Sequence, residues 1–288
     1  MIQLFLKERF IVANNIFICE FHRPTFKIAT FNEIIFALLF SFNKLKTKSF
    51  YFQNICLSDG INIALGTHRL YQSFSEVKPL PDNTIIFNLE PLDIQSTDLA
   101  HKRYLDLLSL SKVIDYSPKN IATLKSIGNE DTFLFKFGFF PFLNNCTVPK
   151  FDHSLFYGVI TERRKIILNS LVNSNIHIKA INNVWAFERD YEIISANSVV
   201  NISKMKNSPL EIYRLWHTLS LGTSVVSEKG FDPDLALMWS EFVNFTDSFD
   251  NINRSAFSTQ LKSPEIYKNN TSFEHSCVDL LNWISLIF

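Results

Sequence analysis

Short apolar runs alternate with stretches of helical periodicity along the chain. In the first half the runs are rich in β-branched and aromatic residues, and they cover residues 15–21, 49–52, 61–65, 84–88, 112–116 and 131–137. Runs of this length and composition predict β-strands, and strands that alternate with helices predict a mostly parallel sheet. The first half is therefore expected to form an α/β unit.

Helix starts are marked at two places in this half. Thr30 stands three residues before Glu33, which is the spacing of a capping box, and apolar positions at helical spacing follow. Ser117 and Pro118 supply a cap and a proline at the first helical position, and Gly128 supplies the stop. Both segments are predicted to be helices.

The alternation breaks over residues 143–152 and then starts again. Strands are predicted at 154–158, 177–181, 199–202 and 224–227, with helices at 162–172, 189–196 and 209–221 and a closing amphipathic helix at 274–287. This pattern predicts a second Rossmann-like unit. We therefore expect two domains, residues 1–145 and residues 146–288.

The loops after these strands are where chemistry is expected. The chain has only seven glycines and contains neither the G-x-G-x-x-G fingerprint nor a P-loop, which argues against a dinucleotide-dependent oxidoreductase. In open parallel sheets a ligand lies beyond the carboxyl ends of the strands. Polar residues at predicted strand ends are thus the candidates for a site.

One such loop leads from Gly158 into a predicted helix that begins with Arg163 and Arg164 in its first turn. The unpaired amides of a helix N-terminus attract anions, and arginine adds bidentate charged hydrogen bonds. This segment is suited to binding a phosphate. An equally simple interpretation makes Gly158 a turn residue and the two arginines solvated charges.

The helix over residues 209–221 carries three polar residues along one stripe. Ser208 and Glu211 fit a capping box, so the first role of Glu211 is structural, while Arg214 and His217 follow at spacings of three. The stripe faces either a ligand cleft or water. Glu228 closes the next strand, where it could accept hydrogen bonds from sugar hydroxyls or be an exposed charge.

In the first half, Glu90 and Asp115 stand at corresponding strand ends. They are candidates for the acceptor side of a cleft and for a general base, although a turn or cap role is common for such residues. Asp232 and Asp234 match the D-x-D metal motif, but Pro233 between them favours a turn. No metal site and no cofactor are expected.

Composition narrows the function classes. Lysine plus arginine and aspartate plus glutamate both number 28, so no positive field favours nucleic acid as a partner. The longest apolar run, residues 34–40, is too short to span a bilayer, and the start offers no secretory signal. We expect a cytoplasmic protein. Its 29 phenylalanines would also suit pairing of two copies, or peripheral contact with the inner face of the membrane.

Four blocks of sequence together resemble bacterial glycosyltransferases of the B fold, in particular a spore-maturation-like (CgeB-like) group. The blocks span about half of the chain, and they are Ile85-Ile86-Phe87-Asn88-Leu89-Glu90, Asp115-Tyr116-Ser117 with Asn120, Tyr157-Gly158 with Arg163-Arg164, and Glu211 to Arg214 leading to Val225-Val226-Ser227-Glu228. Their order and spacing carry the resemblance, because each block alone is weakly specific.

The resemblance implies two Rossmann-like domains whose parallel sheets face a central cleft. It implies a nucleotide-diphosphate sugar as co-substrate, bound mainly by the second domain, and a glycan, lipid-linked or protein acceptor on the first. Transfer without a metal is implied, with Gly158, Arg163 and Arg214 at the diphosphate. The implied process is bacterial polysaccharide or glycoconjugate synthesis.

The chain also departs from related patterns. Many B-fold enzymes hold the ribose with a glutamate on the helix before the glycine, whereas here His217 stands five residues before Gly222. A non-catalytic relative that keeps a sugar or nucleotide site, or only an assembly surface, is therefore the alternative. A nucleotide-sugar epimerase is less favoured, because its histidine and carboxylate constellation is not evident.

Overall fold

The computed structural model describes residues 15–21, 31–71, 80–142, 148–204, 210–247, 249, 257, 262–270 and 272–288. The chain divides into two compact units. Unit 1 comprises Met1–Lys136 with Phe273–Phe288, and unit 2 comprises Phe137–Ser272. The predicted boundary after residue 145 differs from this division, since the chain enters unit 2 at Phe137 and its last helix returns to unit 1.

Unit 1 is built on a six-stranded parallel sheet in the order β2-β1-β3-β4-β5-β6. Its strands are β1 (Asn15–Glu20), β2 (Lys48–Gln53), β3 (Ile61–Leu65), β4 (Thr84–Asn88), β5 (Lys112–Asp115) and β6 (Thr132–Leu134). Each corresponds to a predicted run. All positions of β3 and β4 are buried, which explains why apolar residues occur on both faces of these strands rather than at alternate positions. Asn62, Thr84 and Asn88 are buried polar exceptions.

The helices in the described part of unit 1 are α1 (Asn32–Lys44), α2 (His68–Tyr71), α3 (Leu99–Ser109), α4 (Pro118–Ser126) and α11 (Phe273–Ile287). Helix α4 begins as predicted, because Ser117 Oγ accepts the amide of Asn120 at 3.1 Å. Helix α1 has Phe31 at its N-cap without a side-chain cap bond, and Thr30 lies outside the described residues. Helix α3 was not predicted, although Tyr104, Leu105, Leu107 and Leu108 give it a buried apolar face.

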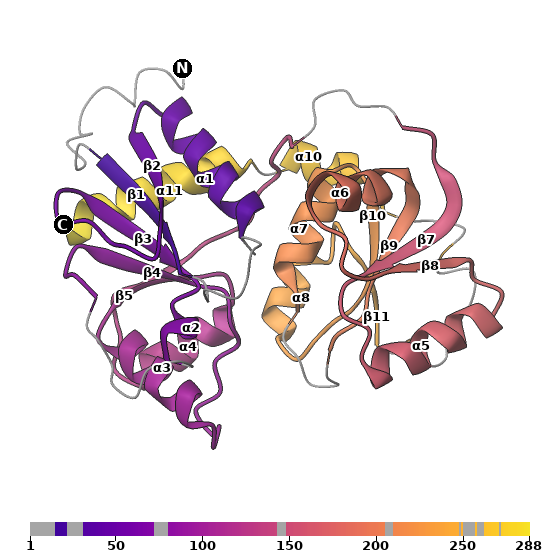
Figure 1. The fold of residues 1–288 in the computed structure, drawn as a ribbon, viewed down its shortest axis with the longest axis horizontal. Helices are drawn as coiled ribbons and strands as arrows, with labels where there is room; N and C mark the ends of the chain where they lie inside the picture. The colour runs from indigo at the N-terminus through magenta and orange to yellow at the C-terminus, as the bar shows by residue number, and fades with distance from the viewer. Residues whose placement is uncertain are drawn as a thin grey trace. The chain divides into compact units, whose positions relative to one another are not determined.

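The last helix packs in unit 1 against the first. Figure 1 shows α1 and α11 next to each other. Lys44 forms an ion pair with Glu274, and the ring of Phe273 lies 5.3 Å from that of Phe135. The apolar face predicted for residues 274–287 is thus buried in unit 1, whereas the segment that precedes it in sequence belongs to unit 2.

Unit 2 has a five-stranded parallel sheet in the order β11-β10-β9-β7-β8. Its strands are β7 (Phe151–Tyr157), β8 (Ile178–Ile181), β9 (Ala196–Asn201), β10 (Ser224–Glu228) and β11 (Asn244–Thr246), and its helices are α5 (Glu162–Asn173), α6 (Ala186–Ser195), α7 (Ile212–Ser220), α8 (Pro233–Trp239) and α10 (Pro264–Asn270). Strand order reverses between β7 and β9. A ligand of such a sheet is expected beyond the carboxyl ends of those two strands.

Buried polar contacts explain why unit 2 begins at Phe137. The indole nitrogen of Trp216 donates to Gly138 O at 2.9 Å, and Tyr267 Oη donates to Phe137 O at 2.7 Å. Both side chains are almost completely buried. The segment after β6 is therefore fixed to unit 2 before the predicted linker is reached.

None of the helices in the described ranges is long and apolar enough to cross a membrane.

We predict that Tyr267→Phe lowers the free energy of unfolding by about 1–3 kcal/mol, because the buried carbonyl of Phe137 loses its partner. Urea unfolding followed by circular dichroism would measure this. Tyr191→Phe is the matched control, since the side chain of Tyr191 is 42% exposed and its hydroxyl is not needed by the core. Equal effects of the two variants would contradict the prediction.

Candidate functional site

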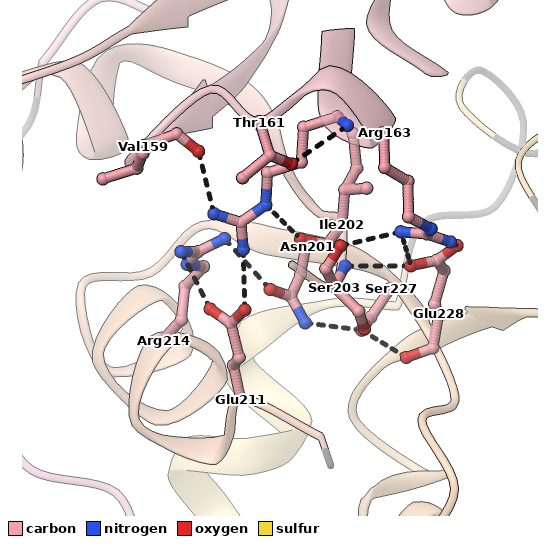
Figure 2. Close-up of polar contacts among 11 residues, drawn as sticks. Val159, Thr161, Arg163, Asn201, Ile202, Ser203, Glu211, Arg214, Ser227 and Glu228 are labelled. Atoms are coloured by element: carbon pink, nitrogen blue, oxygen red, sulfur yellow. Dashed lines mark hydrogen bonds and ion pairs between the residues drawn. The ribbon is translucent and has the colours of Figure 1, made fainter. Parts of the chain in front are cut away.

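Charged residues gather at the carboxyl edge of the unit 2 sheet (Figure 2). Figure 2 labels Arg163 in the first turn of α5, Glu211 just before α7, Arg214 in α7 and Glu228 at the end of β10. Arg164, also in the first turn of α5, is the fifth charged residue, and the uncharged Gly158 lies in the loop after β7. All six were candidates from the sequence. The strand reversal between β7 and β9 lies at the same edge.

Arg163 and Glu228 form a two-pronged ion pair. The guanidinium of Arg163 contacts both carboxylate oxygens of Glu228 and also donates to Ser203 O at 2.7 Å. The amide of Ser203 donates to Glu228 Oε2 at 2.9 Å. Only 7% of Glu228 is exposed, so this residue is a buried partner of arginine and not an exposed charge at a strand end.

Glu211 lies between two arginines. Its Oε1 accepts from Arg164 Nη2 at 2.7 Å, and its Oε2 is 2.8 Å from Arg214 Nη2. Burial lowers the pKa of Arg164, while the carboxylate of Glu211 acts in the opposite direction. Three arginines therefore face two glutamates, and the group keeps one net positive charge.

Two polar residues that were not candidates connect these ion pairs. Arg214 Nη1 donates to Asn201 Oδ1 at 3.2 Å, and Asn201 Nδ2 donates to Ser227 Oγ at 2.9 Å. Ser227 in turn donates to the carbonyl of Glu228 at 2.7 Å. Asn201 is the last residue of β9. Polar residues at strand ends were the candidates from the sequence, so Asn201 becomes a candidate as well once the bounds of β9 are known.

Gly158 allows Arg214 to approach the backbone. Its φ is +123°, and a Cβ atom at this position would lie 3.1 Å from Arg214 Nη2. The amide of Gly158 donates to Ile181 O at 3.1 Å. Because the N–H group of Gly158 is already bonded to the neighbouring strand β8, it is not available to donate to an anion.

Helix α7 begins at Ile212, and Glu211 takes the N-cap position without a side-chain cap bond. The predicted capping box is therefore not completed by Glu211, whose carboxylate is bound by the arginines; Ser208 lies outside the described residues. His217 is 1% exposed, so it does not face water. Its Nε2 is 3.4 Å from Asp190 Oδ1.

Asp190 was not a candidate from the sequence, since it sits inside helix α6 and not at a strand end. Burial raises its pKa, but the contacts with His217 and Arg189 outweigh this and lower the pKa below the ordinary value. The ring of His217 also stacks on Tyr213, with 10° between the ring planes. His217 is thus part of a buried polar group that lies one helical turn after Arg214 on α7.

In unit 1, Asp115 lies inside the protein. It is 0% exposed, and its carboxylate accepts from Asn88 Nδ2 at 2.6 Å and from the amide of Ser117 at 2.8 Å, with Asn120 as a third donor. Burial raises the pKa of Asp115 to about 7, although these hydrogen bonds oppose the rise. The carboxylate of Asp115 is thus enclosed by donors of the protein, and its role as a catalytic residue stays a prediction.

Glu90 is better placed for chemistry. Asn88 and Asn120, both held by Asp115, donate to the carbonyl of Glu90 at 2.8 and 3.0 Å. The Glu90 side chain is 41% exposed, and its Oε1 is 3.4 Å from His68 Nε2. Desolvation raises the pKa of Glu90, and the charge of Arg69 opposes this. Asp115 thus positions the backbone of Glu90 through two amides.

The D-x-D segment begins helix α8, where the proline had led us to predict a turn. Asp232 is the N-cap of α8, and its Oδ1 accepts the amide of Leu235 at 3.0 Å. Within the described ranges, histidine, cysteine, aspartate and glutamate form no cluster of three or more that could hold a metal ion.

Comparison of the sequence with protein-family models and with curated proteins gave no match. Among solved structures, the chain is similar to AviGT4, a glycosyltransferase involved in avilamycin A biosynthesis, with a TM-score of 0.59, 12% identity and 94% of each chain covered. A DNA-modifying β-glucosyltransferase has a TM-score of 0.41 at 9% identity, covering 95% of this chain and 98% of its own. CalG4, the calicheamicin glycosyltransferase, has a TM-score of 0.33 at 6% identity, covering 95% and 94%. The last two are too distant to support an argument.

The first of these similarities, together with the two parallel sheets, establishes the fold. The chain has the α/β fold of the glycosyltransferase B type, with two Rossmann-like units.

We predict that Asp115 makes stability depend on pH. The folded protein keeps a proton on Asp115 up to about pH 7, whereas the unfolded chain releases it near the ordinary pKa of 3.8. The stabilisation is therefore complete below the ordinary pKa and is lost as pH rises, by about 1.4 kcal/mol per pH unit. Asp115→Asn should remove this slope in denaturant titrations; an unchanged slope would contradict the assignment.

We predict that Gly158→Ala destabilises unit 2 by about 1–2 kcal/mol from backbone strain alone. It should also displace Arg214. Gly222→Ala is the control, because Gly222 also has a positive φ, of +79°, but a Cβ atom added there would meet no atom within 4 Å. Thermal unfolding of both variants should show a larger loss for Gly158→Ala, and equal losses would mean that the contact with Arg214 is unimportant.

Proposed function

We propose that the protein transfers a sugar from a nucleotide-diphosphate sugar to a glycan, lipid-linked or protein acceptor in bacterial polysaccharide or glycoconjugate synthesis. Unit 2 would bind the donor and unit 1 the acceptor. The observation that carries this proposal is the arginine cluster at the carboxyl edge of the unit 2 sheet, where the strand order reverses.

The cluster has the chemistry that a departing diphosphate needs. Arginine forks form bidentate hydrogen bonds with phosphate, and groups fixed before the reaction stabilise charge as it develops. Arg164 and Arg214 are largely buried, with side chains 4% and 12% exposed, so little water screens them. In this proposal the arginines supply the positive charge without a metal ion.

For the acceptor we propose Glu90 as general base. A base is most effective when its pKa lies near the working pH, and burial raises the pKa of Glu90 in that direction. Asp115 would act through Asn88 and Asn120 by holding the backbone of Glu90 in place.

One observation supports the second candidate, a non-catalytic relative that only binds a nucleotide or sugar. Each arginine of the cluster already has a carboxylate partner within the protein. A site whose arginines are all paired in this way could also have a purely structural role. Binding and turnover must therefore be measured separately.

We predict that UDP, GDP, CDP or TDP raises the Tm, because a ligand at about 100 times its Kd stabilises the folded state by about 2.7 kcal/mol. Arg214→Ala should abolish the shift. Lys165→Ala is the matched control, since Lys165 is an exposed cation on the same helix as Arg164. No shift with any of the four nucleotides, or equal losses in the two variants, would contradict the proposed donor site.

Turnover distinguishes the enzyme from the binding protein. The assay uses a sugar donor that carries the nucleotide selected by the thermal screen. Glu90→Gln should lower the rate of sugar transfer, or the rate at which the donor is hydrolysed, by about 100-fold or more. Its nucleotide-induced Tm shift should match that of the wild type. A variant with unchanged turnover would remove Glu90 from the mechanism, and a wild type without turnover would favour the binding protein.

A further inference from the structure

Glu211 stands out among the charged residues of the cluster because one carboxylate is shared by two arginines. Each of its oxygens contacts a different guanidinium, Arg164 at 2.7 Å and Arg214 at 2.8 Å. The two arginines come from different helices, α5 and α7. Figure 2 shows the carboxylate of Glu211 beside the guanidinium of Arg214.

This contact has the form that a phosphate group would make. A phosphate also presents neighbouring oxygens that accept from separate guanidinium groups, and arginine recognises carboxylate and phosphate with the same donors. The carboxylate of Glu211 therefore occupies a position where two buried cations converge on one small anion.

The two arginines are held independently of Glu211. Arg164 also donates to Ile202 O at 2.9 Å and to Val159 O at 3.0 Å. Arg214 also donates to Asn201 Oδ1 at 3.2 Å. If Glu211 moved away, these bonds would keep both guanidinium groups in place, and the pair would remain ready for another anion.

Glu211 itself is the least fixed member of the cluster. In the described part of the chain its carboxylate has hydrogen bonds or ion pairs with the two arginines alone, and its side chain is 30% exposed. Glu228, in contrast, also accepts the amide of Ser203, and its side chain is 9% exposed. Glu211 also precedes α7 and caps no amide, so the helix does not depend on its side chain.

Electrostatics require an anion between these arginines. Two neighbouring buried cations repel each other, and removing one partner of a buried ion pair leaves an uncompensated charge. We propose, as an extension of the proposed function, that Glu211 takes the place of one phosphate group in the ligand-free protein and that the diphosphate of the donor displaces it. Glu211 then keeps the empty site intact and weakens the binding of anions that cannot bridge both arginines.

The test compares binding of inorganic pyrophosphate and of UDP to wild type, Glu211→Gln and Glu162→Gln by titration calorimetry. Glu162 is an exposed glutamate in the first turn of α5. Its substitution removes an equal charge near the site and leaves the contacts of Glu211 with Arg164 and Arg214 unchanged. Without ligand, Glu211→Gln should have a lower Tm than wild type. It should bind pyrophosphate at least about tenfold more tightly, a gain of about 1.4 kcal/mol, while Glu162→Gln changes affinity much less.

Each other outcome has a distinct meaning. If wild type binds pyrophosphate or UDP and Glu211→Gln binds equally or more weakly, the displacement is overturned while the proposed donor site stands. An equal gain in Glu162→Gln overturns it as well, because the effect is then general charge. If neither anion binds any of the three proteins, and none of the four nucleotides raises the Tm, the proposed function itself fails.

A second variant covers poor folding of Glu211→Gln. Glu211→Asp keeps the charge but is one methylene shorter, so it should not reach both arginines. Its pyrophosphate affinity should also exceed that of the wild type, and the gain should disappear in Glu211→Asp combined with Arg214→Ala. A gain that persists without Arg214 would overturn the proposal.

Discussion

A guanidinium group removed from water must find acceptors for its charge and its donors, and this constraint shapes the carboxyl edge of unit 2. Arg164 is almost completely buried, and its donors are taken by two backbone carbonyls and a carboxylate. Because β7, β9 and β10 all end at this edge, the acceptors come from separate parts of the sequence. The hydrogen bonds and ion pairs that provide partners for the arginines also fix the relative position of three strand ends and two helices.

Much of this arrangement could be predicted from the sequence. Buried parallel strands give continuous apolar runs, so the strand ends were identifiable, and the strand-end rule selected Arg163 and Glu228 together although 65 residues separate them. Local sequence could not identify the partners. Glu211 fits a capping box by spacing, but its carboxylate is bound instead by arginines, because two buried cations attract it more strongly than one amide does.

Other features depend on contacts that sequence periodicity does not record. Asp115 and Glu90 stand at equivalent strand ends, yet one side chain is enclosed by amides while the other reaches solvent, and the enclosing asparagines decide this. The start of unit 2 is set by the bond from Trp216 to Gly138, which lie 78 residues apart. Helix α3 was missed although Asp98 caps its first turn and its apolar residues follow helical spacing.

The return of α11 to unit 1 makes unit 2 an insertion within the other unit. Unit 2 is continuous in sequence, whereas unit 1 lacks the helix that packs on α1 until all of unit 2 has been synthesised. On the ribosome, the later of the two units in the sequence can therefore reach its native state first. The apolar face of α1 that α11 covers stays open during that interval, so unit 1 can complete its core only after unit 2 has been synthesised.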